Sequence, residues 1–339
     1  MERRPVEFLW RRLKDLGSEA RQRVGAFLSA NPDDLVFVPN ATTGAATVLA
    51  SLSLGPGDQI LMTDHAYPAI RNAARRTCDR TGADLMVLHL PLPLPRAGEI
   101  TAAVARELTD RTRLLIIDHV TSPTAAVFPL TEIVARSRAR GVPVMVDGAH
   151  APGMLPIDLT ALSSDFWTGN FHKWVCAPKG AAALWVRDDH QATVKPLITS
   201  HGYGGSFHDE FDWTGTHDPT PYLSVPAALE FFDSLGWDRV RTHNHELAAY
   251  GQRVVSEALG TDPPVPEDSF GSMAAVELPN GVGATDEDAA ALQARLYDEH
   301  RIEVPIYVLN AKGLVRLSAQ VYNCPQDYDR LAEALPRVL

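Results

Sequence analysis

The chain has 339 residues, 45% hydrophobic and 22% charged, a composition typical of a folded globular protein and not of a disordered or fibrous one. Its net charge of −11 argues against nucleic-acid or anionic-membrane partners, because phosphate binding needs a basic surface. The cysteines, Cys78, Cys176 and Cys324, lie far apart, which argues against a structural zinc site and a disulfide framework. With no signal core and no apolar run of membrane-spanning length, we expect a cytoplasmic protein.

Residues 6–28 predict an amphipathic helix, because apolar side chains recur at helical spacing between arginines. Asn31-Pro32-Asp33 ends this helix, and short apolar strands then alternate with helices. Strands are expected at 35–38, 59–62, 85–88, 114–117 and 142–146, and helices at 41–54, 68–81, 101–108 and 130–140. This order predicts an α/β protein whose mostly parallel sheet is covered on both faces.

The second half of the chain has a different character. Residues 202–221 are rich in Gly, His, Asp and Thr and predict a long loop. A helical run at 226–259, strands at 272–278, 302–308 and 314–317, and helices at 286–300 and 326–335 then predict a smaller α+β domain. We therefore expect a helical segment over 1–30 that packs with the small domain, a large domain over 31–225 and a small C-terminal domain over 226–339.

Polar residues follow the predicted strands, at the edge where open parallel sheets bind ligands. Thr42 and Thr43 open a helix, whose free N–H groups could bind an anion, although a plain helix cap explains them as well. Tyr67 could stack on a planar ligand or cover the core edge. The short polar side chains of Asp118 to Ser122 could reach a ligand or cap their loop.

Asp147 directly follows an all-apolar strand, where a carboxylate is costly unless it has a cationic or protonated partner. A capped turn or a salt bridge would also account for it. Lys173 lies between a histidine and a tryptophan in Thr168-Gly169-Asn170-Phe171-His172-Lys173-Trp174. A lysine whose pKa can fall becomes a nucleophile toward an aldehyde, and an exposed loop lysine is the alternative.

Together these groups suit pyridoxal 5′-phosphate. Its aldehyde needs a lysine, its pyridine nitrogen an aspartate, its phosphate a helix N-terminus and its ring face an aromatic side chain or histidine. The sequence therefore predicts an enzyme that uses this cofactor. The alternatives are a non-catalytic protein on the same fold and a metal-dependent enzyme, the latter resting on 12 scattered histidines.

The chain resembles fold-type I pyridoxal phosphate enzymes of the class V aminotransferase group, and within it the isopenicillin N epimerase-like branch. The strings that carry the resemblance run in family order over nearly the whole chain. They are Phe37-Val38-Pro39-Asn40-Ala41-Thr42-Thr43-Gly44, Asp64-His65-Ala66-Tyr67, Val146-Asp147-Gly148-Ala149-His150, the stretch around Lys173, Trp213-Thr214-Gly215-Thr216 and Val315-Arg316-Leu317-Ser318.

The resemblance implies roles for these residues. Lys173 would form the Schiff base and shuttle protons, Asp147 would pair with the pyridine nitrogen, and Tyr67 would stack on the ring. His150 and Ser122 would lie near the ring hydroxyl. The phosphate would be held by Thr42, Thr43, Asn170 and His172, with Thr216 reaching the phosphate of the neighbouring subunit in a homodimer. Arg316 would clamp the carboxylate of an amino-acid substrate, a group that its planar fork matches.

Two departures from the family pattern bear on function. Family members usually carry a further N-terminal segment, so we expect either a trimmed or misassigned start or a member that lacks the segment. The loop over 306–314 has no cysteine, where desulfurase relatives carry a catalytic one, which argues against persulfide chemistry.

The reaction itself stays open between epimerisation, cleavage of a carbon–sulfur bond, transamination and decarboxylation, because all four use the same lysine and aspartate. We favour a biosynthetic enzyme acting on an unusual amino acid, on analogy with the branch. Five further side chains could line the pocket or simply pack: His65, His201, Tyr203, His208 and Tyr222.

Overall fold

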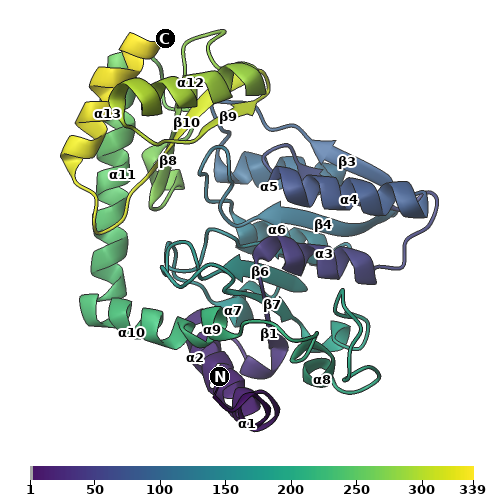
Figure 1. Ribbon diagram of the computed structural model, residues 1–339. Helices are drawn as coiled ribbons and strands as arrows, with labels where there is room; N and C mark the ends of the chain where they lie inside the picture. The colour runs from purple at the N-terminus through teal and green to yellow at the C-terminus, as the bar shows by residue number, and fades with distance from the viewer. Residues whose placement is uncertain (1–2) are drawn as a thin grey trace.

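The computed structural model describes residues 3–339. The predicted first helix is divided: α1 (Pro5–Glu7) leads into a π-helical turn (Phe8–Arg12) and then into α2 (Leu13–Leu28). Ser29, in the left-handed conformation with φ 48°, ends α2 by donating its N–H to the carbonyl of Gly25. α2 packs against β1 (Leu35–Val38) and two later helices, α9 (Thr220–Leu223) and α10 (Val225–Leu235). Figure 1 shows this segment at one end of the molecule.

A seven-stranded sheet forms the larger part of the molecule, in the order β1-β7-β6-β5-β4-β2-β3. Its strands are β1 (Leu35–Val38), β2 (Gln59–Thr63), β3 (Asp84–Leu88), β4 (Thr112–Asp118), β5 (Val144–Asp147), β6 (Phe166–Asn170) and β7 (Ala182–Val186). All neighbours from β6 to β3 are parallel, whereas β7 runs antiparallel to both β6 and β1. The predicted mostly parallel sheet is therefore confirmed, and its strand order places the carboxyl ends of β4, β5 and β6 side by side.

Helices cover both faces of this sheet, as alternation along β4 shows. Leu114 and Ile116 join a core with α3 (Ala41–Ser51) and α4 (Pro68–Thr81), while Leu115 and Ile117 join the opposite core. That second core includes α2, α5 (Ala97–Glu107) and α6 (Leu130–Arg138). Successive side chains of a strand point to opposite faces, so an all-apolar strand such as β4 needs a helical layer on each side.

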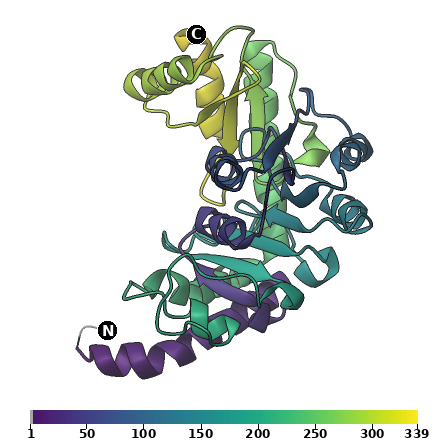
Figure 2. The same ribbon diagram turned by 90° about the vertical axis from the view of Figure 1, so that its right-hand side faces the viewer.

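The C-terminal part forms a second sheet with helices on one side. The predicted run at 226–259 is two helices, α10 (Val225–Leu235) and α11 (Trp237–Leu259), which meet at Gly236 with φ 82°. The sheet has the order β8-β10-β9, from β8 (Met273–Glu277), β9 (Ile306–Leu309) and β10 (Lys312–Ser318). α11 packs against β8 and α13 (Pro325–Val338), and α12 (Asp286–His300) contacts β9 and α13. Figures 1 and 2 show α11 running from α10 up to this small sheet.

The predicted long loop over 202–221 is partly helical, which corrects that expectation. α8 (Phe207–Phe211) begins in it, and α9 (Thr220–Leu223) begins at its end. Ser206 caps α8 by accepting from the N–H of Asp209, whose carboxylate accepts from the N–H of Ser206 in return. The Ser-x-x-Asp spacing is typical of a helix start and would have predicted α8 from the sequence.

One hydrogen bond joins the turn between β9 and β10 to the large sheet. Asn310 and Ala311 form the two-residue turn, both with positive φ (51° and 58°). Asn310 Nδ2 donates at 2.9 Å to Asp64, which follows β2 and also accepts from the N–H of Leu90 at 3.1 Å.

Between residues 3 and 339, no helix has the length and apolarity needed to cross a membrane. Within the same residues, no group of three or more His, Cys, Asp or Glu side chains is placed to hold a metal ion.

Candidate active site

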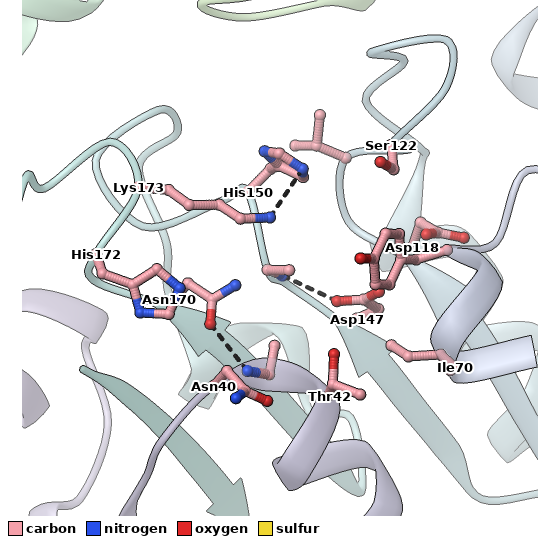
Figure 3. A pocket seen from close by; sticks show the side chains of 14 residues that line it. Asn40, Thr42, Ile70, Asp118, Ser122, Asp147, His150, Asn170, His172 and Lys173 are labelled. Carbon is pink, nitrogen blue, oxygen red and sulfur yellow. Dashed lines mark hydrogen bonds between the residues drawn. The ribbon is translucent and has the colours of Figure 1, made fainter. Parts of the chain in front are cut away.

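A cavity of about 260 Å³ opens at the carboxyl ends of β4, β5 and β6. It is the place where open α/β sheets bind ligands. Figure 3 shows side chains from these strand ends and from the start of α3 converging on it. Its lining includes most of the predicted site residues: Thr42, Tyr67, Ser122, Asp147, His150, Asn170, His172 and Lys173.

The N-terminus of α3 forms one wall. Asn40 caps the helix by accepting from the N–H of Thr43 at 2.9 Å and from its hydroxyl at 3.1 Å. Asn170 Oδ1, buried at the end of β6, accepts from the N–H of Ala41 at 2.8 Å. Among residues 3–339, no partner accepts from the N–H of Thr42, so this amide and the Thr42 hydroxyl remain available to an anion.

Thr43 therefore serves the cap and is not part of the cavity lining. The helix can approach β6 closely because Gly44 has no side chain. A Cβ on Gly44 would lie 2.2 Å from Thr168 Oγ1, so any larger residue would push the start of α3 away from the cavity.

Two carboxyl groups lie side by side on neighbouring strands. Asp118 and Asp147 are paired in register at the ends of β4 and β5, and their side chains are 2% and 5% exposed. Burial raises the pKa of Asp147, while the N–H of Ala149, bonded at 3.0 Å, and nearby Lys173 lower it. Burial, together with the Asp147 charge, raises the pKa of Asp118 well above its usual range.

Lys173 projects into the cavity from the loop after β6. Its Nζ lies 2.9 Å from His150 Nε2, as Figure 3 shows. Burial lowers the pKa of Lys173 to about 8, against the attraction of Asp147 and with help from the Arg316 charge. With this pKa roughly one tenth of the amine is uncharged at pH 7, far more than for an ordinary lysine, and the uncharged form is the nucleophile. Burial, Lys173 and Arg316 also depress the pKa of His150 well below its usual range, so this imidazole is neutral.

His172 and Tyr67 offer the cavity a ring nitrogen and an aromatic face. His172 Nδ1 is buried and has no hydrogen-bond partner within the described part of the chain, and burial lowers the pKa of this residue. Tyr67 stands at the start of α4 and is 42% exposed. An orphaned nitrogen and a half-exposed aromatic ring in the same cavity leave both free for a ligand.

Arg316 lies on β10 in the small sheet and does not line this cavity, although its charge acts on Lys173 and His150. Its Nη1 donates to the Ser122 carbonyl at 2.8 Å and to the Ser122 hydroxyl at 3.1 Å. The guanidinium carbon lies 4.8 Å from the centre of the Tyr307 ring. Arg316 Nε is buried and has no partner in residues 3–339, so one edge of the fork remains open to a carboxylate.

Other predicted residues lie elsewhere. Thr216 is exposed on the loop before α9 and does not line this cavity. His65 is buried and bonded through Nδ1 to the Thr124 hydroxyl at 2.9 Å. The remaining candidates, His201, Tyr203, His208 and Tyr222, also lie outside the lining.

Asn40, Tyr307 and Trp174 were not predicted as site residues, and Asp118 was considered only within the stretch Asp118 to Ser122. Asn40 and Asp118 could have been chosen, because each stands at a strand end within a string already singled out. Tyr307 and Trp174 depend on packing. Tyr307 pairs with Leu314, two residues before Arg316 on the same face of β10.

The donor set fits pyridoxal phosphate. One cavity holds the Lys173 amine, whose pKa is lowered, and the buried carboxyl group of Asp147. It also holds the N–H of Thr42 and the Nδ1 of His172, both unbonded within residues 3–339, and the half-exposed ring of Tyr67. These match the aldehyde, pyridine nitrogen, phosphate and ring face of that cofactor.

Comparisons with known proteins agree with this reading. The family model described as aminotransferase class-V matches residues 4–331. An isopenicillin N epimerase from Amycolatopsis lactamdurans is 36% identical, over 98% of this chain and 87% of that protein. A probable chloroplastic L-cysteine desulfhydrase from Arabidopsis thaliana is 34% identical, over 98% of this chain and 76% of its own.

Solved structures share the fold. A C-DES mutant with glycine covalently linked to its PLP cofactor has a TM-score of 0.83 at 22% identity, covering 96% of this chain and 86% of that one. A cysteine desulfurase from Thermococcus onnurineus NA1 has a TM-score of 0.81 at 19% identity, covering 96% and 84%. The expected α/β fold of type I pyridoxal phosphate transferases is confirmed.

Proposed function

Because the chain belongs to the aminotransferase class-V family and is a pyridoxal phosphate-dependent enzyme, we propose that Lys173 is its cofactor-binding lysine and that the enzyme epimerises an α-amino acid. One observation carries the proposal: the Lys173 amine, with its pKa lowered to about 8, lies 2.9 Å from His150 in a cavity that also holds Asp147. An amine in this state can attack an aldehyde and can accept a proton.

Different residues of the cavity would bind different parts of the cofactor. Asp147 would supply the carboxylate that keeps the pyridine nitrogen protonated, and Tyr67 the aromatic face. The Thr42 amide and hydroxyl, with His172 Nδ1, would bind phosphate oxygens. Asn170 supports this site by holding the first turn of α3, and Thr43 supports it through the cap. Ser122 would act through Arg316, since its hydroxyl and carbonyl are both bonded there.

The substrate would enter with its carboxylate toward Arg316, whose Nε has no other partner within residues 3–339. When bound, pyridoxal phosphate withdraws electrons from Cα and so weakens its bonds. Lys173 would remove the Cα proton with its neutral amine, and inversion then requires that a second acid deliver a proton to the opposite face of Cα. His150 would remain neutral beside Lys173 and hold the amine by a hydrogen bond.

Epimerisation has support from the relatives, because two isopenicillin N epimerases are 36% and 33% identical over 98% of this chain. Cleavage of a carbon–sulfur bond is the second candidate. An L-cysteine desulfhydrase is 34% identical over the same share, and the C–S lyase C-DES shares the fold at a TM-score of 0.82. None of the three cysteines lines the cavity, which gives no support to a persulfide route.

Incubation with D- and L-amino acids and with cysteine conjugates in deuterated water separates the two. Exchange at Cα with inversion and no other product supports epimerisation. Pyruvate with a released thiol supports C–S cleavage and overturns epimerisation. A keto acid with aminated cofactor would overturn both in favour of transamination, and loss of carbon dioxide would do so in favour of decarboxylation. Lys173→Ala is the control, since it retains the cavity but lacks the base.

The assembly and compartment are part of the proposal. We propose a homodimer in which the exposed Thr216 reaches the partner's cofactor phosphate. Sedimentation with and without cofactor tests this, and a monomer that is fully active would contradict it. We also propose a cytoplasmic location, supported by three cysteines that are all unpaired.

A further inference from the structure

The residue after Lys173 touches the same histidine as the lysine does. Trp174 is 8% exposed, and its indole Nε1 donates a hydrogen bond to His150 Nδ1 at 3.4 Å. His150 Nε2 lies 2.9 Å from Lys173 Nζ, a contact drawn in Figure 3. The imidazole is therefore held on both nitrogens by two consecutive residues.

These contacts determine where the imidazole proton lies. An indole N–H can only donate, so His150 Nδ1 must accept and carry no hydrogen. A neutral imidazole has one N–H, which must then be on Nε2. His150 is neutral, because burial opposes a second proton, as does the charge of Arg316. Nε2 therefore donates its hydrogen to the neighbouring Lys173 Nζ.

A donated hydrogen bond can be accepted only by an amine that has a free lone pair. An ammonium group is donor-only and would face the Nε2 hydrogen head-on. In the opposite tautomer, Nδ1 would carry the hydrogen and confront the Trp174 N–H instead. The arrangement thus favours the uncharged lysine, a preference that Arg316 shares and Asp147 opposes.

Trp174 is held at both its side chain and its backbone, because its indole packs in a buried cluster with Val120, Ala125, Met154 and Met273. The Trp174 carbonyl accepts from Gln320 Nε2 at 3.2 Å, and Gln320 is itself bonded to Asn244 on α11. On the other side Gly153, with φ 87°, lies so close that a Cβ there would be 2.9 Å from the Trp174 carbonyl carbon. Such close packing on two sides is what a positioning residue needs.

We propose that Trp174 is a positioning residue that holds His150 as the Nε2–H tautomer, so that His150 donates to the Lys173 amine. The inference rests on the proposed role of Lys173, because its catalytic value depends on that lysine being the nucleophile and base. It adds to the site a residue whose action passes through His150.

The first test reads the tautomer directly. The full chain is labelled with ¹⁵N-histidine, and long-range ¹H–¹⁵N spectra are recorded with and without cofactor, with His150→Gln for assignment. The wild type should show a protonated Nε2 and a bare Nδ1 on His150. Trp174→Phe should mix the two tautomers. Replacement of Trp174 by β-(3-benzothienyl)alanine should do the same, because it keeps the shape of the side chain and removes only the donor. A protonated Nδ1 in the wild type, or unchanged spectra in both variants, would overturn the inference.

The second test measures the pH at which the Lys173 amine titrates. Reductive methylation of Lys173 in the cofactor-free chain, quantified by peptide mass spectrometry across pH, gives the midpoint of its titration. Trp174→Phe should raise that midpoint by about one pH unit, the equivalent of one ordinary hydrogen bond. The control Trp185→Phe, which removes a buried indole on β7, should leave it unchanged. An equal midpoint in wild type and Trp174→Phe would contradict the inference. Borohydride trapping away from Lys173 would instead overturn the proposed function and leave the tautomer result standing.

Discussion

Arg316, on the small sheet, donates two hydrogen bonds to Ser122, in the turn that follows β4 of the large sheet, at 2.8 Å to the carbonyl and 3.1 Å to the hydroxyl. Both hydrogen bonds come from Arg316 Nη1, and the buried Nε of Arg316 has no hydrogen-bond partner in the described chain. The arginine is thus aligned before any ligand arrives, with one edge open. Preorganisation of this kind lowers the entropic cost of binding.

Arg316→Lys should lower kcat/KM for carboxylate substrates by roughly 10- to 100-fold, because an ammonium cannot bond Ser122 and a carboxylate with one planar fork. The loss should appear mainly in KM, measured by steady-state kinetics. Lys312→Ala is the matched control on the same strand, since Lys312 pairs with Glu277 at 2.8 Å. An unchanged KM in Arg316→Lys would remove Arg316 from the substrate site.

Lys173→Ala should abolish covalent capture of the cofactor and lower turnover by roughly 10³-fold, since both the nucleophile and the base are lost. Borohydride followed by peptide mapping measures the capture. Lys179→Ala is the control, because the exposed Lys179 only donates to the His172 carbonyl at 3.1 Å. Capture that persists at another lysine in Lys173→Ala would contradict the assignment.

Capture of added pyridoxal phosphate by the cofactor-free chain should depend on pH with a midpoint near 8. A lowered lysine pKa means that the neutral amine becomes available at lower pH. The rate should rise about tenfold per pH unit below the midpoint and level off above it, whereas the rate for an ordinary lysine would level off only above about pH 10.4. Stopped-flow absorbance measures it, and a rate still rising at pH 10 would refute the prediction.

Asp118→Asn should stabilise the cofactor-free protein at pH 8 but not at pH 4. The folded-state pKa of Asp118 is raised by burial and by Asp147, so its protonated form contributes stability that is lost as pH rises through that pKa. The amide never ionises and avoids this loss, worth roughly 1–3 kcal/mol. Urea unfolding at both pH values measures it. A variant that is less stable at pH 8 would show that Asp118 has a partner when ionised.

Much of this site was readable from the sequence because parallel strands bring their carboxyl ends to one edge. The predicted helix 68–81 has the observed bounds, since Pro68 opens it and Gly82 ends it with φ 76°. Asp147, His150 and Lys173 were predicted as one group, and the structure places them in one cavity.

The rest depends on how loops fold, which residue spacing does not encode. Ser122 lines the cavity, where it was expected near a ring hydroxyl, but the sequence did not predict that its hydroxyl and carbonyl bond Arg316, 194 positions away in the chain. The contact between Trp174 and His150 likewise arises because the Lys173 loop is held between Gly153 and Gln320. Such pairs follow from tertiary packing, not from local pattern.

The hydrogen bond between Asn310 and Asp64 anchors the β9–β10 hairpin at a point outside the cavity. Arg316 and Tyr307 lie on the two arms of that hairpin, and its turn is anchored to the end of β2. This bond fixes the turn end of the hairpin that carries Arg316 and Tyr307, and neither Asn310 nor Asp64 lines the cavity. Under the proposed function, Asn310 would therefore help to place Arg316 for the substrate carboxylate without lining the cavity itself.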